Sequence, residues 1–271
     1  MMRPLAEFPP EALRAVRYVL ADIDDTLTLD GRLTADAYGA MEAIRAAGLK
    51  MAAITGRPAG WCDLIARQWP VDGVVGENGA FYFSYDEAAR TMRRRYWKDS
   101  AERTADRRRL DALAEKILAA VPGAALSADQ PYREADLAID YCEDVAPLGD
   151  AAVAQIMRLF EAAGAHAKIS SIHVNGWFGD YDKLAMTRIL FREVFAVDLD
   201  GLRETVVFAG DSPNDAPMFD YFPNAVGVAN LADFAGRIDA EPAWITRAPG
   251  GHGFAELAAA ILEARAPMKR P

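Results

Sequence analysis

The first eighty residues alternate short apolar runs with longer amphipathic segments. The segments at residues 35–47 and 58–69 predict helices, because Thr34 suits an N-cap and Pro58 suits a first helical turn. The order β-α-β-α-β with short connections predicts a parallel sheet covered on both faces, with ligands beyond the carboxyl ends of its strands. The apolar runs that predict buried strands are Tyr18–Ile23, Lys50–Ile54 and Gly73–Gly76.

The pattern changes after Gly79, where an aromatic run is followed by a long, highly charged helical segment. The next hundred residues or so mix strand and helix periods, which predicts an inserted α+β unit. The predicted strands here are Phe81–Tyr85, Ala135–Tyr141 and Ala167–Val174, and the predicted helices are Ala101–Val121 and Leu148–Ala163.

From Lys183 the parallel-sheet pattern resumes. The chain is therefore predicted to be an α/β protein with a doubly wound, Rossmann-like parallel sheet. We expect a core of residues 1–82 and 183–271, a separate unit of residues 83–182, and frayed, proline-containing ends. The resumed elements are helices at 183–195, from 213 and at 254–264, with strands at 205–209, 225–229 and 243–246.

Composition limits the partners that this chain can have. Its 52% hydrophobic and 26% charged residues are typical of a globular protein. Its net charge of -10 produces an electrostatic field that repels nucleic acid and anionic lipid. No apolar run approaches the roughly 20 residues of a membrane span. Cys62 and Cys142 form no CxxC pair, so we expect reduced thiols and a soluble, unexported, cytoplasmic protein.

The most informative segment is the acidic end of the first strand. Asp22, Asp24 and Asp25 place three carboxylates within four residues, directly after an apolar run. Their mutual repulsion is costly unless a cation joins them, so a bound hard metal ion is the simplest reason for the pattern. The alternative is an acidic loop that caps the following turn.

A second apolar strand, residues 205–209, also ends in carboxylates. Asp211 and Asp215 follow it, and adjacent strands would bring Asp211 beside Asp22. Taken alone, the segment also fits an ordinary helix start, with Asp211 or Ser212 as N-cap. Paired with the first acidic segment, it favours a shared metal site.

Two further pieces lie at strand or helix ends. Thr55, Gly56 and Arg57 follow the second strand, and Lys183 begins the helix that re-enters the core. Each has an ordinary explanation, a turn for the first and a solvated charge for the second.

In this order, the four segments resemble the haloacid dehalogenase (HAD) superfamily, whose motifs are Asp-x-Asp-x-Thr, Ser/Thr, Lys and Gly-Asp-x-x-x-Asp. The resemblance covers about residues 17–79 and 182–264. The insertion after Glu77-Asn78-Gly79 resembles a type C2 cap of the C2B group, which includes sucrose-phosphate, mannosyl-phosphoglycerate, trehalose-phosphate and Cof-like phosphatases and phosphomannomutases. Asp25 stands where many relatives have glycine, and Leu184 follows the lysine where glycine is common.

The resemblance implies a Mg²⁺-dependent phosphatase acting on a small phosphorylated molecule, such as a sugar phosphate. Asp22 would attack phosphorus, and Asp24 would protonate the leaving oxygen, which favours phosphoryl transfer over carbon–halogen cleavage. Mg²⁺ would be held by Asp22, the Asp24 carbonyl, Asp211 and Asp215. The implied contacts to the substrate are Thr55, Gly56, Arg57, Lys183 and Asn214.

The inserted unit is expected to bind the part of the substrate other than its phosphoryl group, and so to determine specificity. Alternation in a strand puts Ser171, His173 and Asn175 on one face, where they could meet sugar hydroxyls, with Trp177 as a stacking plane. The alternative is a half-exposed strand with ordinary surface polar residues.

Three other functions fit parts of the pattern. A phosphomutase would use the same core and Asp22 but return the phosphoryl group to the sugar. A signalling receiver also combines an acidic pocket with Thr and Lys, although the inserted unit and Asp24 speak against it. A non-catalytic sugar-phosphate binder is disfavoured because every motif position is filled.

Overall fold

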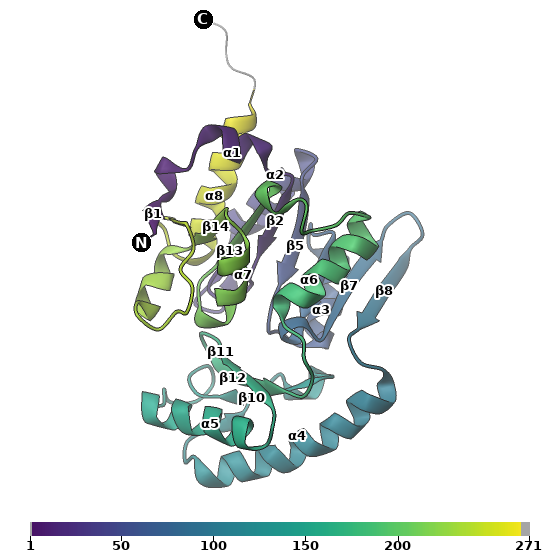
Figure 1. Ribbon diagram of the computed structural model, residues 1–271, viewed down its shortest axis with the longest axis vertical. Helices are drawn as coiled ribbons and strands as arrows, with labels where there is room; N and C mark the ends of the chain where they lie inside the picture. Colours follow the sequence, from purple (N-terminus) through teal and green to yellow (C-terminus); the bar gives the residue numbers. More distant parts are fainter. Residues whose placement is uncertain (1, 267–271) are drawn as a thin grey trace, which may run out of the picture.

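The computed structural model describes residues 2–266 and divides into a large and a small unit (Figure 1). In these residues, nine strands form the sheet of the large unit, and its antiparallel pairs are β6 with β7 and β7 with β8. The order across the sheet is β1 (Arg3–Pro4), β15 (Trp244–Ile245), β14 (Ala225–Gly227), β13 (Val206–Gly210), β2 (Tyr18–Ala21), β5 (Lys50–Ile54), β6 (Gly73–Gly76), β7 (Phe81–Asp86) and β8 (Thr91–Tyr96).

Helices cover both faces of this sheet, because its central strands are apolar on both sides. Val19 of β2 packs with the helices of one face, and Leu20 packs with those of the other. The first face carries α1 (Pro10–Ala15), α2 (Ala35–Ala46), α3 (Ala59–Gln68) and α8 (Gly250–Arg265), and the second carries α6 (Lys183–Leu190) and α7 (Ala216–Tyr221).

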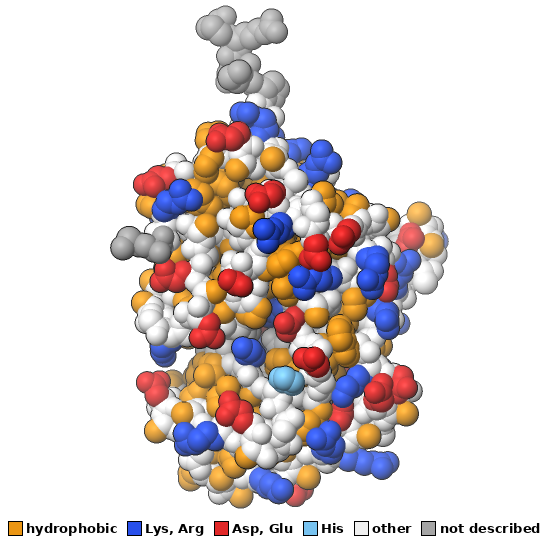
Figure 2. Space-filling view, viewed as in Figure 1, with side chains coloured by type: hydrophobic (Ala, Val, Ile, Leu, Met, Phe, Trp, Pro, Cys, Tyr) orange, Lys and Arg blue, Asp and Glu red, His pale blue; other side chains and the backbone are white. Residues whose placement is uncertain are grey.

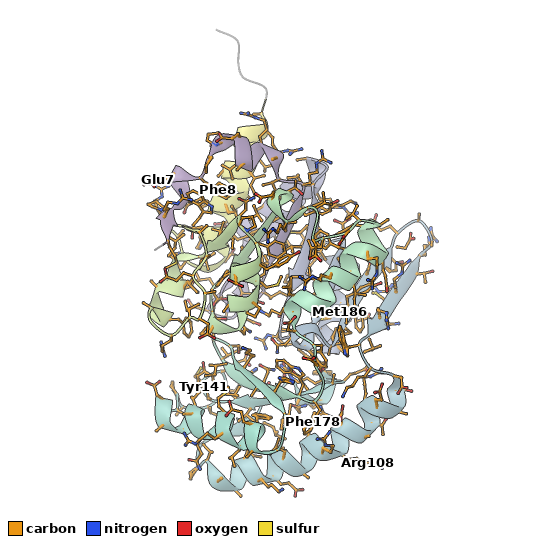
Figure 3. The ribbon with its side chains drawn as sticks, viewed as in Figure 1. Glu7, Phe8, Arg108, Tyr141, Phe178 and Met186 are labelled. Atoms are coloured by element: carbon orange, nitrogen blue, oxygen red, sulfur yellow. The ribbon has the colours of Figure 1, made fainter. Side chains whose placement is uncertain are left out.

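The small unit is a separate layered structure below the large one (Figure 1). Its sheet has the order β11 (His166–Ile169), β12 (His173–Trp177), β10 (Asp136–Asp140) and β9 (Ala125–Leu126), all antiparallel. The helices α4 (Ser100–Ala120) and α5 (Asp150–Ala162) bury an apolar cluster against it, including Leu110, Ile156 and Phe160. The opposite face of the sheet is turned towards the large unit (Figure 1). Tyr141, labelled in Figure 3, follows β10 and packs against the apolar cluster.

Short elements complete the chain. The β3–β4 hairpin is antiparallel and follows the first acidic segment. Within residues 2–266, no helix combines the length and the apolar character needed to cross a membrane. These elements are the strands β3 (Thr28–Leu29) and β4 (Arg32–Leu33), a π-helix at Phe191–Phe195, and 3-10 helices at Leu5–Glu7, Glu77–Gly79, Gln130–Tyr132, Arg203–Thr205, Pro213–Asp215 and Ala229–Phe234.

Two sequence predictions about these elements are wrong. The predicted strand at 167–174 is a hairpin, because the Ser170 hydroxyl accepts from the backbone N–H groups of Ile172 and His173 and turns the chain. The described residues at the start of the chain are also not frayed, since Arg3–Pro4 pairs with β15 and Phe8 stacks on Trp244. The corresponding prediction for residues 267–271 lies outside the described residues.

The division of the chain at residues 82 and 183 stays a prediction. Strand β8, at Thr91–Tyr96, extends the sheet of the large unit, whereas Leu110 to Phe178 supply the apolar cluster of the small unit. We therefore propose that the first crossing between the units lies after Tyr96.

The two units meet at a tight corner of the backbone. Glu77, Asn78 and Gly79 all have positive φ, and a Cβ at Gly79 would collide with the main-chain carbonyl of Asp182. Only glycine has no Cβ, so it alone allows this close approach. Because Asp182 directly precedes Lys183, the corner fixes where the chain re-enters the core.

Glu77 secures the small unit through a buried carboxylate. Its oxygens accept hydrogen bonds from the backbone N–H groups of Ala59 in the core and of Glu134, Ala135 and Asp136 in the small unit, at 2.6–3.2 Å. Burial, followed by the charge of Asp136, raises the pKa of Glu77 to about 7, whereas Arg133 and the N–H donors favour the carboxylate. The contact therefore joins the two units through main-chain groups.

Glu77→Gln is expected to lower the free energy of unfolding by about 2–4 kcal/mol, because an amide –NH₂ would face buried N–H donors and leave them unpaired. Urea unfolding followed by circular dichroism measures this change. The exposed Glu87, paired with Arg45, is a matched control, and Glu87→Gln should change stability by less than about 1 kcal/mol. Equal midpoints for both variants would contradict the anchoring role of Glu77.

Candidate active site

The site lies where three parallel strands of the large sheet end. Asp22 follows β2, Thr55 follows β5 and Asp211 follows β13, as predicted. The ladder continues one residue into the site, since the Asp22 N–H donates to the Ala209 carbonyl at 2.9 Å and the Thr55 N–H donates to Val75 at 2.8 Å. The functional side chains are therefore attached to rigid strand ends.

Asp22 and Lys183 form the centre of the site. The Lys183 ammonium lies 3.1 Å from Asp22 Oδ2 and 2.7 Å from Asp215 Oδ1. The other Asp22 oxygen, Oδ1, accepts the N–H of Ile23 at 2.8 Å. Lys183 is 2% exposed, so its charge acts in a largely dry environment, where Coulomb interactions are strong. The alternative explanation of Lys183 as a solvated surface charge is thus wrong.

The carboxylates of Asp22, Asp211 and Asp215 form an acidic cluster whose ligand oxygens lie within 4.8 Å of one another. Thr26 donates to Asp211 Oδ1 at 2.9 Å, whereas the buried Asp211 Oδ2 has no hydrogen-bond partner. A buried oxygen without a partner, within an all-oxygen donor set, fits a hard divalent cation such as Mg²⁺.

The electrostatics of this cluster also favour a cation. Burial raises the pKa of Asp22 to about 8, Lys183 opposes the rise, and Asp215 and Asp24 add to it. Burial likewise raises the pKa of Asp211, with further contributions from Asp22 and Asp215. An additional positive charge would favour the ionised forms and supply an anionic Asp22 at neutral pH.

Asp24 and Arg57 form the edge of the site that faces the small unit. Arg57 Nε lies 2.9 Å from each Asp24 oxygen, and one terminal nitrogen lies 2.8 Å from Oδ1. The Thr55 hydroxyl accepts the Arg57 backbone N–H at 3.0 Å, which links Thr55 to this edge of the site. Arg57 is 4% exposed and its guanidinium lies over the Trp61 ring, at 4.4 Å from the centroid.

Solved structures share the fold of this chain, although no protein-family model and no curated protein matches the sequence. A Thermoplasma acidophilum protein aligns with a TM-score of 0.69 at 17% identity, over 91% of this chain and 98% of its own. The sucrose-phosphatase of Synechocystis, solved with sucrose and phosphate, gives 0.60 at 16%, over 92% and 98%. A HAD superfamily phosphatase from Bacteroides thetaiotaomicron gives 0.55 at 18%, over 90% and 93%.

This chain has the HAD fold. The predicted fold class, a doubly wound α/β HAD core with an inserted α+β cap, is therefore confirmed. From here on, the small unit is called the cap.

The cap of this HAD fold presents polar side chains to the core, as predicted. Ser171, His173 and Asn175 line one cavity together with Asp22 and Asp24. Strand β12 is buried along its length, so the alternative of a half-exposed surface strand is wrong. The prediction for Trp177 is also wrong, because this ring is 3% exposed, packs on Tyr181 and donates its indole N–H to the Tyr181 carbonyl.

Two other predicted residues line the same cavity, Gly56 and Asn214. The Asn214 side-chain oxygen accepts the Ser212 hydroxyl at 2.9 Å, which fixes its orientation. The cavity that these residues line beside Asp22 has a volume of only about 10 Å³, about enough for one water molecule. The cap is thus closed onto the core at this cavity.

Sequence reasoning did not find the charged cap residues of this interface. Arg133 donates to the Gly56 carbonyl at 2.8 Å and pairs with Asp129 and Asp136. Glu143 pairs with Arg57 at 2.7 Å. No local motif marks these residues as part of an interface, because the core groups that they contact lie 77 and 86 positions away in the chain. The only signal is the density of charge around a buried strand.

On the face of the molecule shown in Figure 2, acidic and basic side chains are interspersed. No group of like charges among the described residues on this face resembles the acidic cluster of the site. The acidic cluster is thus a buried feature of the HAD core.

Proposed function

We propose that this protein is a Mg²⁺-dependent phosphomonoester hydrolase that acts on a small phosphorylated metabolite, with a sugar phosphate as the substrate class. The observation that carries this proposal is the buried Asp22, paired with Lys183 and placed beside Asp211 at the ends of adjacent strands. The fold neighbours support it, since they include phosphatases and a sucrose-phosphatase solved with sucrose and phosphate.

In the first step, an Asp22 oxygen attacks phosphorus and forms an aspartyl phosphate. The bond from phosphorus to the ester oxygen breaks, and that oxygen keeps the electron pair and takes a proton from Asp24. Lys183 and the Thr55 hydroxyl stabilise the phosphoryl oxygens as charge develops on them. Both groups are held by the strands and helix that carry them, so no reorganisation is required.

In the second step, water attacks the phosphorus and gives its proton to the Asp24 carboxylate. The bond between phosphorus and the Asp22 oxygen breaks, which releases inorganic phosphate and restores the Asp22 carboxylate. Asp24 therefore acts as acid and then as base. The closed cap limits the water that reaches the site.

The residues that would hold Mg²⁺ are Asp22, Asp211 and Asp215, with the Asp24 carbonyl as a further ligand. When bound, the ion neutralises the carboxylates and the phosphoryl charge. We further propose that the enzyme works in a reducing cytoplasm, because Cys62 and Cys142 are unpaired thiols.

Phosphate release from p-nitrophenyl phosphate and a panel of hexose phosphates tests the proposal, with Mg²⁺ or with EDTA. We expect turnover with Mg²⁺ and a loss of at least about 100-fold in EDTA, since an uncompensated acidic cluster repels a phosphate dianion. Conversion of a hexose 1-phosphate to the 6-phosphate without free phosphate would instead establish a mutase. Binding without any turnover would contradict both reactions.

A further inference from the structure

A chain of four charged or polar side chains crosses from the core into the cap. Asp24 and Arg57 belong to the core, and Glu143 and His173 belong to the cap. The successive contacts are 2.8 Å between Asp24 and Arg57, 2.7 Å between Arg57 and Glu143, and 2.8 Å between Glu143 and His173. The cavity that contains Asp22 lies against three of the four residues.

Arg57 has the geometry of a side chain that orients Asp24. Its Nε and one terminal nitrogen both approach the Asp24 carboxylate, which fixes that group in two directions. The Trp61 ring lies against one face of the guanidinium. With its backbone held by Thr55, Arg57 itself has little freedom inside the closed site.

The cap supplies the other partners of Arg57. Glu143 Oε1 accepts from Arg57, and Oε2 faces His173, so both oxygens of Glu143 are engaged. The loop that carries Glu143 is held in turn by the Asp140 carboxylate, which accepts the Glu143 N–H at 2.8 Å. Asp129, also in the cap, adds a longer contact to Arg57 at 3.3 Å. Moving the cap away removes all these partners at once.

We propose that Arg57 and Glu143 are positioning residues that place the Asp24 carboxyl for proton transfer only when the cap is closed. The inference rests on the proposed function and extends it, because it makes the acid-base step depend on a cap residue that touches neither Asp24 nor phosphorus. Closure of the cap then delivers the substrate and orients its proton donor in one movement.

The leaving group of the substrate separates this role from general support of the fold. A hexose 6-phosphate leaves as a basic alkoxide and needs the Asp24 proton, whereas p-nitrophenolate leaves without one. A positioned general acid contributes roughly 10²–10⁴-fold. If only the positioning of Asp24 is lost, hydrolysis of the sugar phosphate must slow more than hydrolysis of the aryl phosphate. If the fold of the site is lost, hydrolysis of both substrates slows.

We expect Arg57→Ala to lower kcat for a hexose 6-phosphate by about 100-fold and kcat for p-nitrophenyl phosphate by less than about tenfold. Arg57→Lys should recover only part of the loss, because an ammonium lacks the fork that engages both Asp24 and Glu143. Both variants are assayed as full chains, with thermal unfolding followed in parallel.

Glu143→Gln is the decisive variant, because Glu143 is partly exposed and its loss should leave the fold intact. We expect about a tenfold loss of kcat with the hexose phosphate and less than about a twofold loss with p-nitrophenyl phosphate. Glu134→Gln is the matched control, since Glu134 also joins cap to core, through the Tyr96 hydroxyl at 3.0 Å, but lies outside this chain of contacts. Its two kcat values should stay within about twofold of wild type.

The inference would be overturned if Arg57→Ala and Glu143→Gln lowered kcat equally for both substrates, or raised kcat for the hexose phosphate. The proposed function would not be affected. The same result follows if Glu134→Gln shows the selective loss. A wild-type protein that releases no phosphate from any substrate would instead remove the proposed function, and this inference with it.

Discussion

Asp22→Asn should abolish phosphate release, with a fall in kcat of about 10⁴-fold or more, the scale seen when a nucleophile is removed. An amide at this position cannot attack phosphorus, and it also loses the negative charge that faces Lys183 at 3.1 Å. The substitution keeps the size of the side chain, so its effect should lie in kcat and not in folding. Release of inorganic phosphate from p-nitrophenyl phosphate measures it.

Asp25→Asn is the matched control for this result. Asp25 lies in the same acidic segment, and its backbone has φ 54°, a left-handed conformation that asparagine also accepts. We expect this variant to keep activity within about tenfold of wild type. Activity retained in Asp22→Asn, or equal losses in both variants, would contradict Asp22 as the nucleophile.

Lys183→Met should combine a fall in kcat of about 10²–10³-fold with a loss of about 3–5 kcal/mol in the free energy of unfolding of the metal-free protein. The reason is that Lys183 is the cation that faces both Asp22 and Asp215, and its removal leaves their buried charges uncompensated. Urea unfolding in EDTA measures the stability, and phosphate release in Mg²⁺ measures the rate.

This destabilisation should grow with pH. The pKa of Asp22 is about 8 in the folded protein against an ordinary 3.8, so the folded state binds the proton more tightly, and stability is lost as pH rises from 3.8 through about 8. Lys183 lowers this pKa, so its removal extends the pH range over which stability is lost to higher pH. The free energy of unfolding of Lys183→Met should therefore fall further below that of wild type at pH 9 than at pH 5. Lys50→Met, which removes an exposed pair with Asp72, is the control and should cost less than about 1 kcal/mol at either pH.

The periodicity of the sequence predicted the order of most core elements, because buried parallel strands appear as short apolar runs. Elements whose residues depend on distant partners were missed. Strand β8, at Thr91–Tyr96, contains three consecutive arginines and forms only because it pairs with β7. The start of α8 was placed too late because Gly250, Gly251 and Gly253 are poor helix formers. Here Gly250 and Gly251 allow close packing on the chain after β2, where a Cβ at Gly251 would meet the Leu27 carbonyl.

The candidate site was predictable where motif residues follow strands, since adjacent parallel strands end at one edge. The structure brings Asp22, Asp211, Asp215, Lys183 and Thr55 together in this way, and their roles stay proposals. The cap side was less predictable. Alternation placed Ser171, His173 and Asn175 towards the core, although Ser171 lies in a turn and not in the predicted strand. Glu143 carries no local signal, because only the docking of cap on core gives it a partner.

The central strand β2 has a consequence for how the protein is made. One edge of β2 pairs with β13, where Tyr18 lies opposite Val206. This edge of β2 therefore has no neighbouring strand until most of the chain has been synthesised. Closing so long a loop is entropically costly and slows folding. A nascent chain would thus carry a complete cap before its core is closed, with an unpaired apolar edge exposed to aggregation or to chaperones. Asp22 and Asp211 come together only in that pairing, so the candidate site can form only after most of the chain has been made.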